Sequence, residues 1–156
     1  MVAANAQVSE NYQALIPTND SILKEEFLKS DKDYHVIITY TDWCKPYVAG
    51  MPSIIELCSH YDNVETWFIN PDPLKYSSII KKYLAKHPEI DTSYILDGSY
   101  KGSVKKRVIA FRDKIYPSHT GLVGLPMIFI LTKDSKPVDV IIGHDIERLK
   151  VILSGV

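Results

Sequence analysis

The strongest constraint on the fold is a junction at which an apolar run passes, within a few residues, into a helical pattern. Residues His35–Tyr40 read His-Val-Ile-Ile-Thr-Tyr, which is typical of a buried strand. The segment Trp43–Tyr47 follows, and its Pro46 suits the first turn of a helix, where an N–H group would have no partner anyway. Apolar residues then recur at helical spacings of 3, 4 and 3, at Val48, Met51, Ile55 and Cys58. The junction therefore predicts a strand that feeds directly into a helix, with Cys44 at the start of that helix.

The rest of the chain alternates between the same two kinds of pattern. Periodicity and capping residues predict helices at residues 19–29, 44–60, 74–86 and 104–115, and a last helix from Asp145 onward. They predict strands at 34–41, 64–69 and 93–96, and an antiparallel hairpin from 127–131 and 138–142. This alternation indicates an α/β fold with a central mixed β-sheet flanked by helices. We expect residues 19–156 to form a single domain and residues 1–18 to form an N-terminal extension.

Bulk composition argues against several classes of function. A net charge of −1 gives no reason to expect binding to nucleic acid. No apolar stretch reaches the roughly 20 residues that cross a bilayer, so no membrane span is expected. The histidines have no spacing that suggests a metal site, and we expect neither a metal nor a cofactor. The helix at 104–115 has a basic face, which we interpret as a solvated surface, formed by Lys101, Lys105, Lys106, Arg112 and Lys114.

The two cysteines, Cys44 and Cys58, are too far apart to pair. In a continuous helix, 14 residues at about 1.5 Å each separate their Cα atoms by roughly 21 Å, whereas a disulfide needs about 7 Å or less. We interpret Cys58 as a small buried apolar residue. A cysteine at the first turn of a helix faces unpaired backbone N–H groups, which favour the thiolate. Cys44 is therefore the candidate nucleophile.

The N-terminal extension leaves the compartment open. Residues 1–7 have the small-residue Ala-x-Ala character that precedes signal-peptide cleavage, yet no charged or apolar segment comes before them. The extension is either the remnant of a signal region or a plain N-terminal segment. Export to the periplasm or another extracytoplasmic compartment is one expectation, and a cytoplasmic location is the other.

The chain resembles the thioredoxin-like superfamily at three landmarks that occur in the family's order. Trp43-Cys44-Lys45-Pro46 stands at the strand-to-helix turn, and Pro52 follows where thioredoxins have their kinking proline. Gly124-Leu125-Pro126 precedes the hairpin and matches the family's cis-proline loop, and Gly143 closes the hairpin. The resemblance covers roughly residues 34–156. It implies the thioredoxin fold, with an N-terminal helix and an inserted strand and helix before the cis-proline loop.

Within this superfamily the chain is similar to the TlpA-like branch, whose members are commonly exported bacterial thiol-disulfide proteins. Residues 43–52, Trp-Cys-Lys-Pro-Tyr-Val-Ala-Gly-Met-Pro, fit the active-site stretch of that branch except at Tyr47. The first cysteine of a Cys-x-x-Cys pair attacks a disulfide, and the second resolves the mixed disulfide. With Tyr47 in the second place, the attack remains possible but self-resolution does not. Ile38 also stands where many thioredoxins carry a buried acid, although the TlpA-like branch often lacks one.

The resemblance also implies roles for the other site residues. In the active-site turn, Trp43–Tyr47, the phenol of Tyr47 lies one helical turn from the thiol and can hydrogen-bond to it. Pro126, when cis, packs against the thiol. The backbone of Leu125 then pairs with an extended partner segment, so that Gly124–Pro126 form a partner groove. We interpret His119, which precedes this loop, as a surface residue.

Two functions stay open at this point. In the first, Cys44 is a monothiol that forms and releases mixed disulfides with a protein or a small-molecule thiol partner. In the second, the protein is redox-inactive, and the groove at Pro126 binds a peptide or a protein. Whether the protein is an enzyme is open with them; an active form would be a thiol-disulfide oxidoreductase-like protein that lacks the resolving cysteine.

Overall fold

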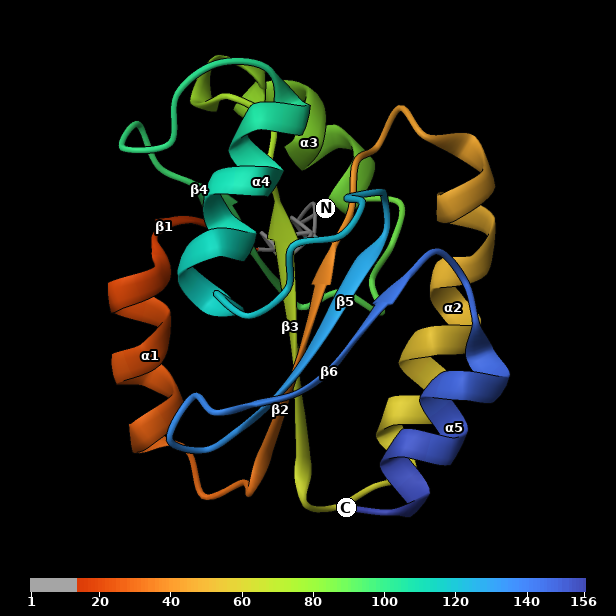
Figure 1. Ribbon diagram of the computed structural model, residues 1–156. Coiled ribbons are helices and arrows are strands. Elements are labelled where there is room, and N and C mark those ends of the chain that lie inside the picture. The colour runs from red at the N-terminus through yellow and green to blue at the C-terminus, as the bar shows by residue number, and fades with distance from the viewer. Residues whose placement is uncertain (1–13) are drawn as a thin grey trace, which may run out of the picture.

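The computed structural model describes residues 14–156, and it describes only the backbone of Pro46, Tyr47 and Val48. Its strands are β1 (Ala14–Thr18), β2 (Tyr34–Thr39), β3 (Val64–Asn70), β4 (Thr92–Leu96), β5 (Met127–Thr132) and β6 (Pro137–Ile142). Its helices are α1 (Asp20–Lys29), α2 (Lys45–Ser59), α3 (Ser77–Leu84), α4 (Val104–Ile115) and α5 (Ile146–Ser154), with a 3₁₀ turn, η1 (Leu74–Tyr76), before α3. Figure 1 shows a twisted sheet that runs between two layers of helices.

The sheet is mixed, as predicted. Its strand order is β1-β4-β3-β2-β5-β6. The pairs β1–β4, β4–β3 and β3–β2 are parallel, whereas β2–β5 and β5–β6 are antiparallel. β2 therefore lies between a parallel and an antiparallel neighbour. Its last residue, Thr39, pairs with Met127, the first residue of β5, so the end of one strand meets the start of the other.

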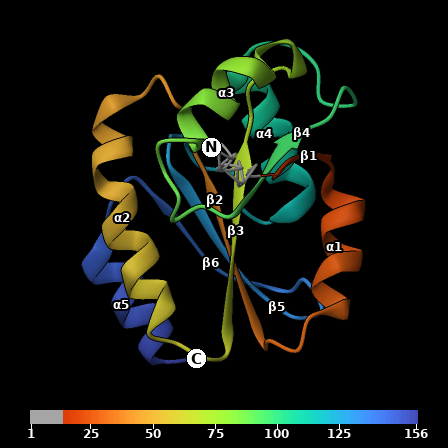
Figure 2. The same ribbon diagram turned by 180° about the vertical axis from the view of Figure 1, so that it is seen from behind.

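Each face of the sheet has its own core. Helices α2, α3 and α5 cover one face through residues such as Ile54, Ile80 and Leu149. Helices α1 and α4 cover the other face through residues such as Phe27 and Phe111. Figures 1 and 2 show the α2–α5 pair and the α1–α4 pair on opposite sides of the sheet. A central strand covered on both faces needs apolar side chains at every position, which explains the continuous apolar run of β2.

The first strand was not predicted, because the sequence pattern assigns residues 14–18 to the N-terminal extension. The structure instead places Ala14–Thr18 at the edge of the sheet, parallel to β4. Pro17 has no N–H group to donate and breaks the sequence signal of a strand, yet proline is tolerated in an edge strand. Residues 1–13, and with them the expected signal remnant, lie outside the described part of the chain.

The segment between α3 and β5 contains the inserted elements. β4 lies between β1 and β3 in the sheet, and α4 follows it before the loop at Pro126. This agrees with the expected inserted strand and helix.

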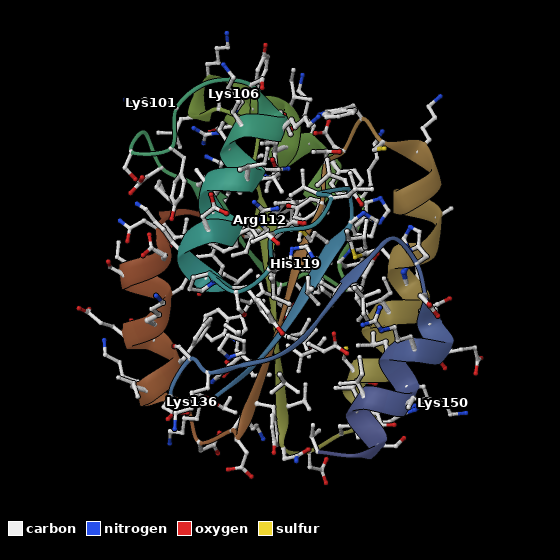
Figure 3. The ribbon with its side chains drawn as sticks, viewed as in Figure 1. Lys101, Lys106, Arg112, His119, Lys136 and Lys150 are labelled. Carbon is white, nitrogen blue, oxygen red and sulfur yellow. The ribbon has the colours of Figure 1, made fainter. Side chains whose placement is uncertain are left out.

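The basic face of α4 is only partly solvated. Lys101 and Lys106 are exposed, and Figure 3 shows them near the start of α4. Arg112 is only 9% exposed, so its interpretation as a solvated residue is wrong. Its Nη1 donates a hydrogen bond to the carbonyl of Gly121 over 2.7 Å, while its Nη2 lies 2.8 Å from the carboxylate of Asp113. Arg112 therefore ties the segment that leads to Pro126 onto α4.

Gly50, in the first half of α2, packs directly against the ring of His144, which follows β6. A Cβ atom built at position 50 would lie 2.5 Å from Cε1 and 2.8 Å from Cγ of that ring. Atoms in proteins do not approach so closely, so the contact requires a residue without a side chain. It joins the part of α2 that begins at Cys44 to the loop between β6 and α5.

The variant Gly50→Ala tests this contact. In an unobstructed helix the change stabilises by about 1 kcal/mol, but here we expect the clash with His144 to lower the free energy of unfolding by about 1–3 kcal/mol. In a His144→Ala background the clash is gone, and Gly50→Ala should stabilise. Urea unfolding of the four proteins measures both effects. An equal effect of Gly50→Ala in the two backgrounds would contradict the contact.

Candidate functional site

Cys44 lies at the point where β2 gives way to α2. Tyr40 and Thr41 continue from the strand and are buried. Cys44 is the N-cap residue of α2, with φ −93° and ψ 81°, and its side chain makes no capping hydrogen bond. The thiol is free and half-buried. It therefore lies at the end of a helix where backbone N–H groups lack helical partners.

Trp43 is held beside this cysteine by a buried carboxylate. Its indole N–H donates to both oxygens of Asp72, each at 3.2 Å. Asp72 is 4% exposed, and its backbone N–H donates to the side-chain oxygen of Asn70 over 2.8 Å. Burial raises the pKa of Asp72 above its usual value, and the negative charge of Asp42 adds to this, while the bond from Trp43 opposes it. Asp72 belongs to no motif or periodic pattern of the sequence and was not predicted as a site residue.

Arg107 supports the loop that carries Asp72. Its guanidinium is buried and donates to the carbonyl oxygens of Pro71 over 2.7 Å, of Leu96 over 2.6 Å and, more closely still, of Tyr100. These carbonyls belong to β4 and to the segments that follow β3 and β4, so one side chain from α4 joins both parts of the chain. Its positive charge also opposes the rise in the pKa of Asp72.

The sequence itself contains a signal that Arg107 points into the protein. The residue lies three positions after Val104 and four before Phe111, so it falls on the apolar stripe of α4 and not on its basic face. A charged residue within an apolar stripe points into the protein, where it must find partners.

The loop at Pro126 forms the opposite wall of the site. The Leu125–Pro126 peptide bond is cis, as the resemblance implies, and Pro126 is buried. The carbonyl of Pro126 accepts a 2.8 Å hydrogen bond from the N–H of Gly143. Gly124 packs closely against β6, because a Cβ atom at this position would lie 2.6 Å from Cγ2 of Ile142. The hairpin thus holds the loop on both sides of Leu125.

The backbone of Leu125 is available to a partner. Among the residues that the structure describes, none forms a hydrogen bond with its N–H or its carbonyl. A backbone segment without hydrogen-bond partners can pair with an extended peptide in the manner of a β-strand.

An open cavity of about 290 Å³ joins the two walls. We call it the thiol cavity, and it is lined by Trp43, Cys44, Val104, Lys105, Val108, Val123, Gly124 and Leu125. Four residues predicted from the sequence therefore meet here: Trp43, Cys44, Gly124 and Leu125. Lys45 is exposed and Pro126 is buried, and neither lines the cavity. The side chains of Pro46 and Tyr47 lie outside the described part of the structure, so the expected contact between Tyr47 and the thiol remains a prediction.

The remaining candidate groups lie away from the cavity. Cys58, near the end of α2, is buried in the core, and burial raises the pKa of its thiol to about 11. Both cysteines are free, as expected from the helix geometry. His119 lines a different pocket, between β6 and the loop after α4. Ile38 is fully buried in β2, and because its side chain is a hydrocarbon this position supplies no acid to the site.

Within residues 14–156, no group of histidine, cysteine, aspartate or glutamate side chains is arranged to hold a metal ion. In the same range, no helix is long and apolar enough to cross a membrane.

Asp72 predicts a pH dependence of stability. A carboxyl group with a raised pKa holds its proton more tightly in the folded chain, so its contribution to stability is present at low pH. That contribution is lost as the pH rises from the usual pKa of 3.8 through the raised pKa.

The variant Asp72→Asn tests this dependence. It keeps an oxygen for the indole N–H but carries no charge, so we expect it to become more stable than the wild type across this pH range and to remain so at neutral pH. Urea unfolding at a series of pH values measures the difference, with Asp62→Asn, a site outside the cavity, as the control. If the free energy of unfolding of the wild type rises relative to that of the Asn variant as the pH increases, the raised pKa of Asp72 is contradicted.

Comparison with known proteins gives matches at the level of structure. No family model matches the chain, and no curated protein shows a significant match. A thiol:disulfide interchange protein of the thioredoxin family from Chlorobium tepidum TLS is 15% identical, with a TM-score of 0.54 over 79% of either chain. The pneumococcal exposed lipoprotein thioredoxin Etrx1 of Streptococcus pneumoniae is 12% identical, with a TM-score of 0.59 over 83% of this chain and 90% of that one. A DsbF homologue from Corynebacterium diphtheriae is 18% identical, with a TM-score of 0.54 over 83% of this chain and 80% of that one. Similarity at these identities establishes the architecture, and we conclude that the chain has the thioredoxin fold.

Proposed function

We propose that the protein carries out thiol–disulfide exchange with Cys44 as its single reactive thiol. The observation that supports this most directly is the position of Cys44, half-buried at the N-terminus of α2 and in one cavity with Leu125 of the cis-proline loop. The Cys44 thiolate attacks one sulfur of a partner disulfide. A bond forms between Cys44 and that sulfur, and the other sulfur leaves as a thiolate.

The second half of the reaction needs a thiol from outside the chain. Cys58 is buried within the core, and Tyr47 occupies the position of a resolving cysteine. A protein or small-molecule thiol therefore attacks the partner's sulfur in the mixed disulfide, forms a new disulfide with it and releases Cys44 as the thiolate. Over the two steps one sulfur of the partner disulfide is exchanged for the incoming thiol, and Cys44 returns to its starting state.

The environment of the thiol is suited to a peptide partner. The thiol cavity is mostly apolar, with Lys105 as its charged residue, and the backbone of Leu125 can pair with an extended chain. We propose a TlpA-like role in an extracytoplasmic compartment of a bacterium. Two of the structural neighbours support this role, since one is named an interchange protein and another an exposed lipoprotein.

One alternative is favoured by the same cavity. An apolar groove beside a free backbone edge is sufficient to bind a peptide without any redox step. In that case the thioredoxin fold would act as a binding module, and the removal of the Cys44 sulfur would leave affinity unchanged.

Alkylation distinguishes the two thiols. We expect iodoacetamide to modify Cys44 at least 100-fold faster than Cys58 in the native protein, because a buried thiol with a pKa of about 11 is about one part in 1,000 thiolate at pH 8. Mass spectrometry after timed quenching gives both rates, and the unfolded chain, in which the rates should converge, is the control. A native Cys44 that reacts as slowly as Cys58 would exclude the monothiol function and favour the binding module.

Tyr47→Cys should restore self-resolution. We expect the wild type to form a stoichiometric mixed disulfide with 5,5′-dithiobis(2-nitrobenzoate), releasing one equivalent of thionitrobenzoate from Cys44. Treated with one equivalent of the reagent, the variant should release a second equivalent of thionitrobenzoate, because the thiol introduced at position 47 displaces the first adduct and forms an intramolecular disulfide with Cys44. Tyr47→Ser removes the same phenol without adding a thiol and should behave as the wild type does. A Tyr47→Cys variant that retains the adduct would show that the turn no longer supports exchange.

A further inference from the structure

A second hollow lies on the other side of Trp43 from the thiol cavity. It measures about 360 Å³, and we call it the aspartate hollow. It is lined by Asp42, Trp43, Asp72, Tyr76, Ile79 and Val104. Trp43 and Val104 also line the thiol cavity, so the two spaces share a wall. A chain that reacts at Cys44 therefore lies against a wall that the two spaces share.

Three of its lining side chains are large, apolar and exposed. The exposed fractions are 57% for Trp43, 41% for Tyr76 and 53% for Ile79. Large apolar side chains that are exposed together commonly mark a surface that binds a partner. Two of these side chains are aromatic, and an aromatic face attracts a cation.

Its charge is negative and is not neutralised by a neighbouring ion pair. Within the described residues, neither Asp42 nor Asp72 forms a salt bridge. Arg107 attracts Asp72 electrostatically, but its N–H groups are occupied by backbone carbonyls. Asp42 raises the pKa of Asp72, so the two carboxylates act on each other. A cation placed between them would relieve this repulsion.

Two lysines of the described part of the chain lie near the aspartate hollow, but neither forms a salt bridge with its aspartates. The ammonium of Lys75 lies over the ring of Tyr76, 5.1 Å from its centroid, yet within the described residues it forms no salt bridge with either aspartate. Lys105 lies on the other side, in the thiol cavity. The site is thus basic on the side of Leu125 and acidic on the side of Asp42.

We propose that the aspartate hollow binds a lysine or arginine side chain of the partner whose disulfide reacts at Cys44. The aliphatic stem of such a side chain packs against Ile79 and Val104, while its cationic end reaches Asp42 and the face of Trp43. No other natural side chain combines a long apolar stem with a charge of the required sign. This assignment names the partner's chemistry and rests on the function proposed above.

Three disulfide peptides test it. Each is acetyl-Ala-Xaa-Cys-Xaa-Ala-amide with the cysteine linked to thionitrobenzoate, and Xaa is lysine, norleucine or glutamate. The symmetric sequence makes the direction of binding irrelevant, and norleucine keeps the stem of lysine without its charge. Cys44 attacks the peptide sulfur and thionitrobenzoate leaves as the thiolate, while mass spectrometry confirms the adduct. We expect the lysine peptide to react about tenfold faster than the norleucine peptide, and the glutamate peptide to be slowest.

Variants locate the preference in the hollow. The ratio of the lysine rate to the norleucine rate should fall towards one in Asp42→Asn, and it should stay at the wild-type value in Asp62→Asn, which removes an equal charge from a site beyond the far end of α2. A ratio of one in the wild type overturns the proposal, as does a ratio that survives Asp42→Asn. In both cases all three peptides still react, so the function proposed for Cys44 stands.

A binding measurement keeps the proposal testable if Cys44 does not react. In the Cys44→Ser protein, tryptophan fluorescence is titrated with the same peptides carrying serine in place of cysteine. We expect the lysine peptide to bind about tenfold more tightly than the norleucine peptide and to lose this advantage in Cys44→Ser/Asp42→Asn. Equal affinities overturn the proposal. Preferential binding without any reaction at Cys44 supports it while contradicting the exchange function.

Discussion

The site depends on the pairing of β2 with β5. Thr39 ends one strand and Met127 begins the other, and the buried hydroxyl of Thr39 lies 2.8 Å from the N–H and 2.9 Å from the carbonyl oxygen of Met127. The chain leaving β2 reaches Cys44 five residues later, and the chain entering β5 has just passed Pro126. A single cross-strand register therefore brings together two segments that are more than 80 residues apart in the sequence. A shift of this register by one residue would move each side chain of the shifted strand to the opposite core, so the packing of the two cores fixes the register that forms the site.

The wall of the site formed by Trp43 depends on the guanidinium of Arg107, which donates hydrogen bonds to backbone carbonyls. Parallel strands leave backbone carbonyls at their carboxyl ends, and Arg107 satisfies two of them at the ends of β3 and β4 by donating to the carbonyls of Pro71 and Leu96. A buried guanidinium in turn makes a buried carboxylate less costly, which allows Asp72 to remain in the interior and to hold the indole of Trp43. Trp43 thus has a fixed place between two hollows although more than half of its surface is exposed.

Local patterns predict the elements of this fold but not the pairs that complete the site. The stripe from Val104 to Ile115 coincides with α4, and the capping role of Asp145 is correct, because both depend on neighbours within a helical turn. β1 was missed since its sequence, interrupted by Pro17, is stabilised by β4, which lies far along the chain. Cys44 and the Gly124–Pro126 loop were found through motifs. Asp72 was not, because its role is defined by an indole 29 positions away, and no spacing rule links the two.

In the exchange function proposed for Cys44, Tyr47 stands where a dithiol protein has its second cysteine, and this changes what the surroundings of the thiol have to do. In a dithiol protein the internal thiol ends every encounter, so a poorly matched partner is released as readily as a good one. A monothiol has no such exit, and a mixed disulfide lasts until an external thiol reaches it. Selection must then occur before the covalent step, through contacts that differ between partners. Surfaces of opposite charge on the two sides of Trp43, with Lys105 on one side and Asp42 on the other, can supply this selection, because they favour one charge pattern and one direction of an incoming chain.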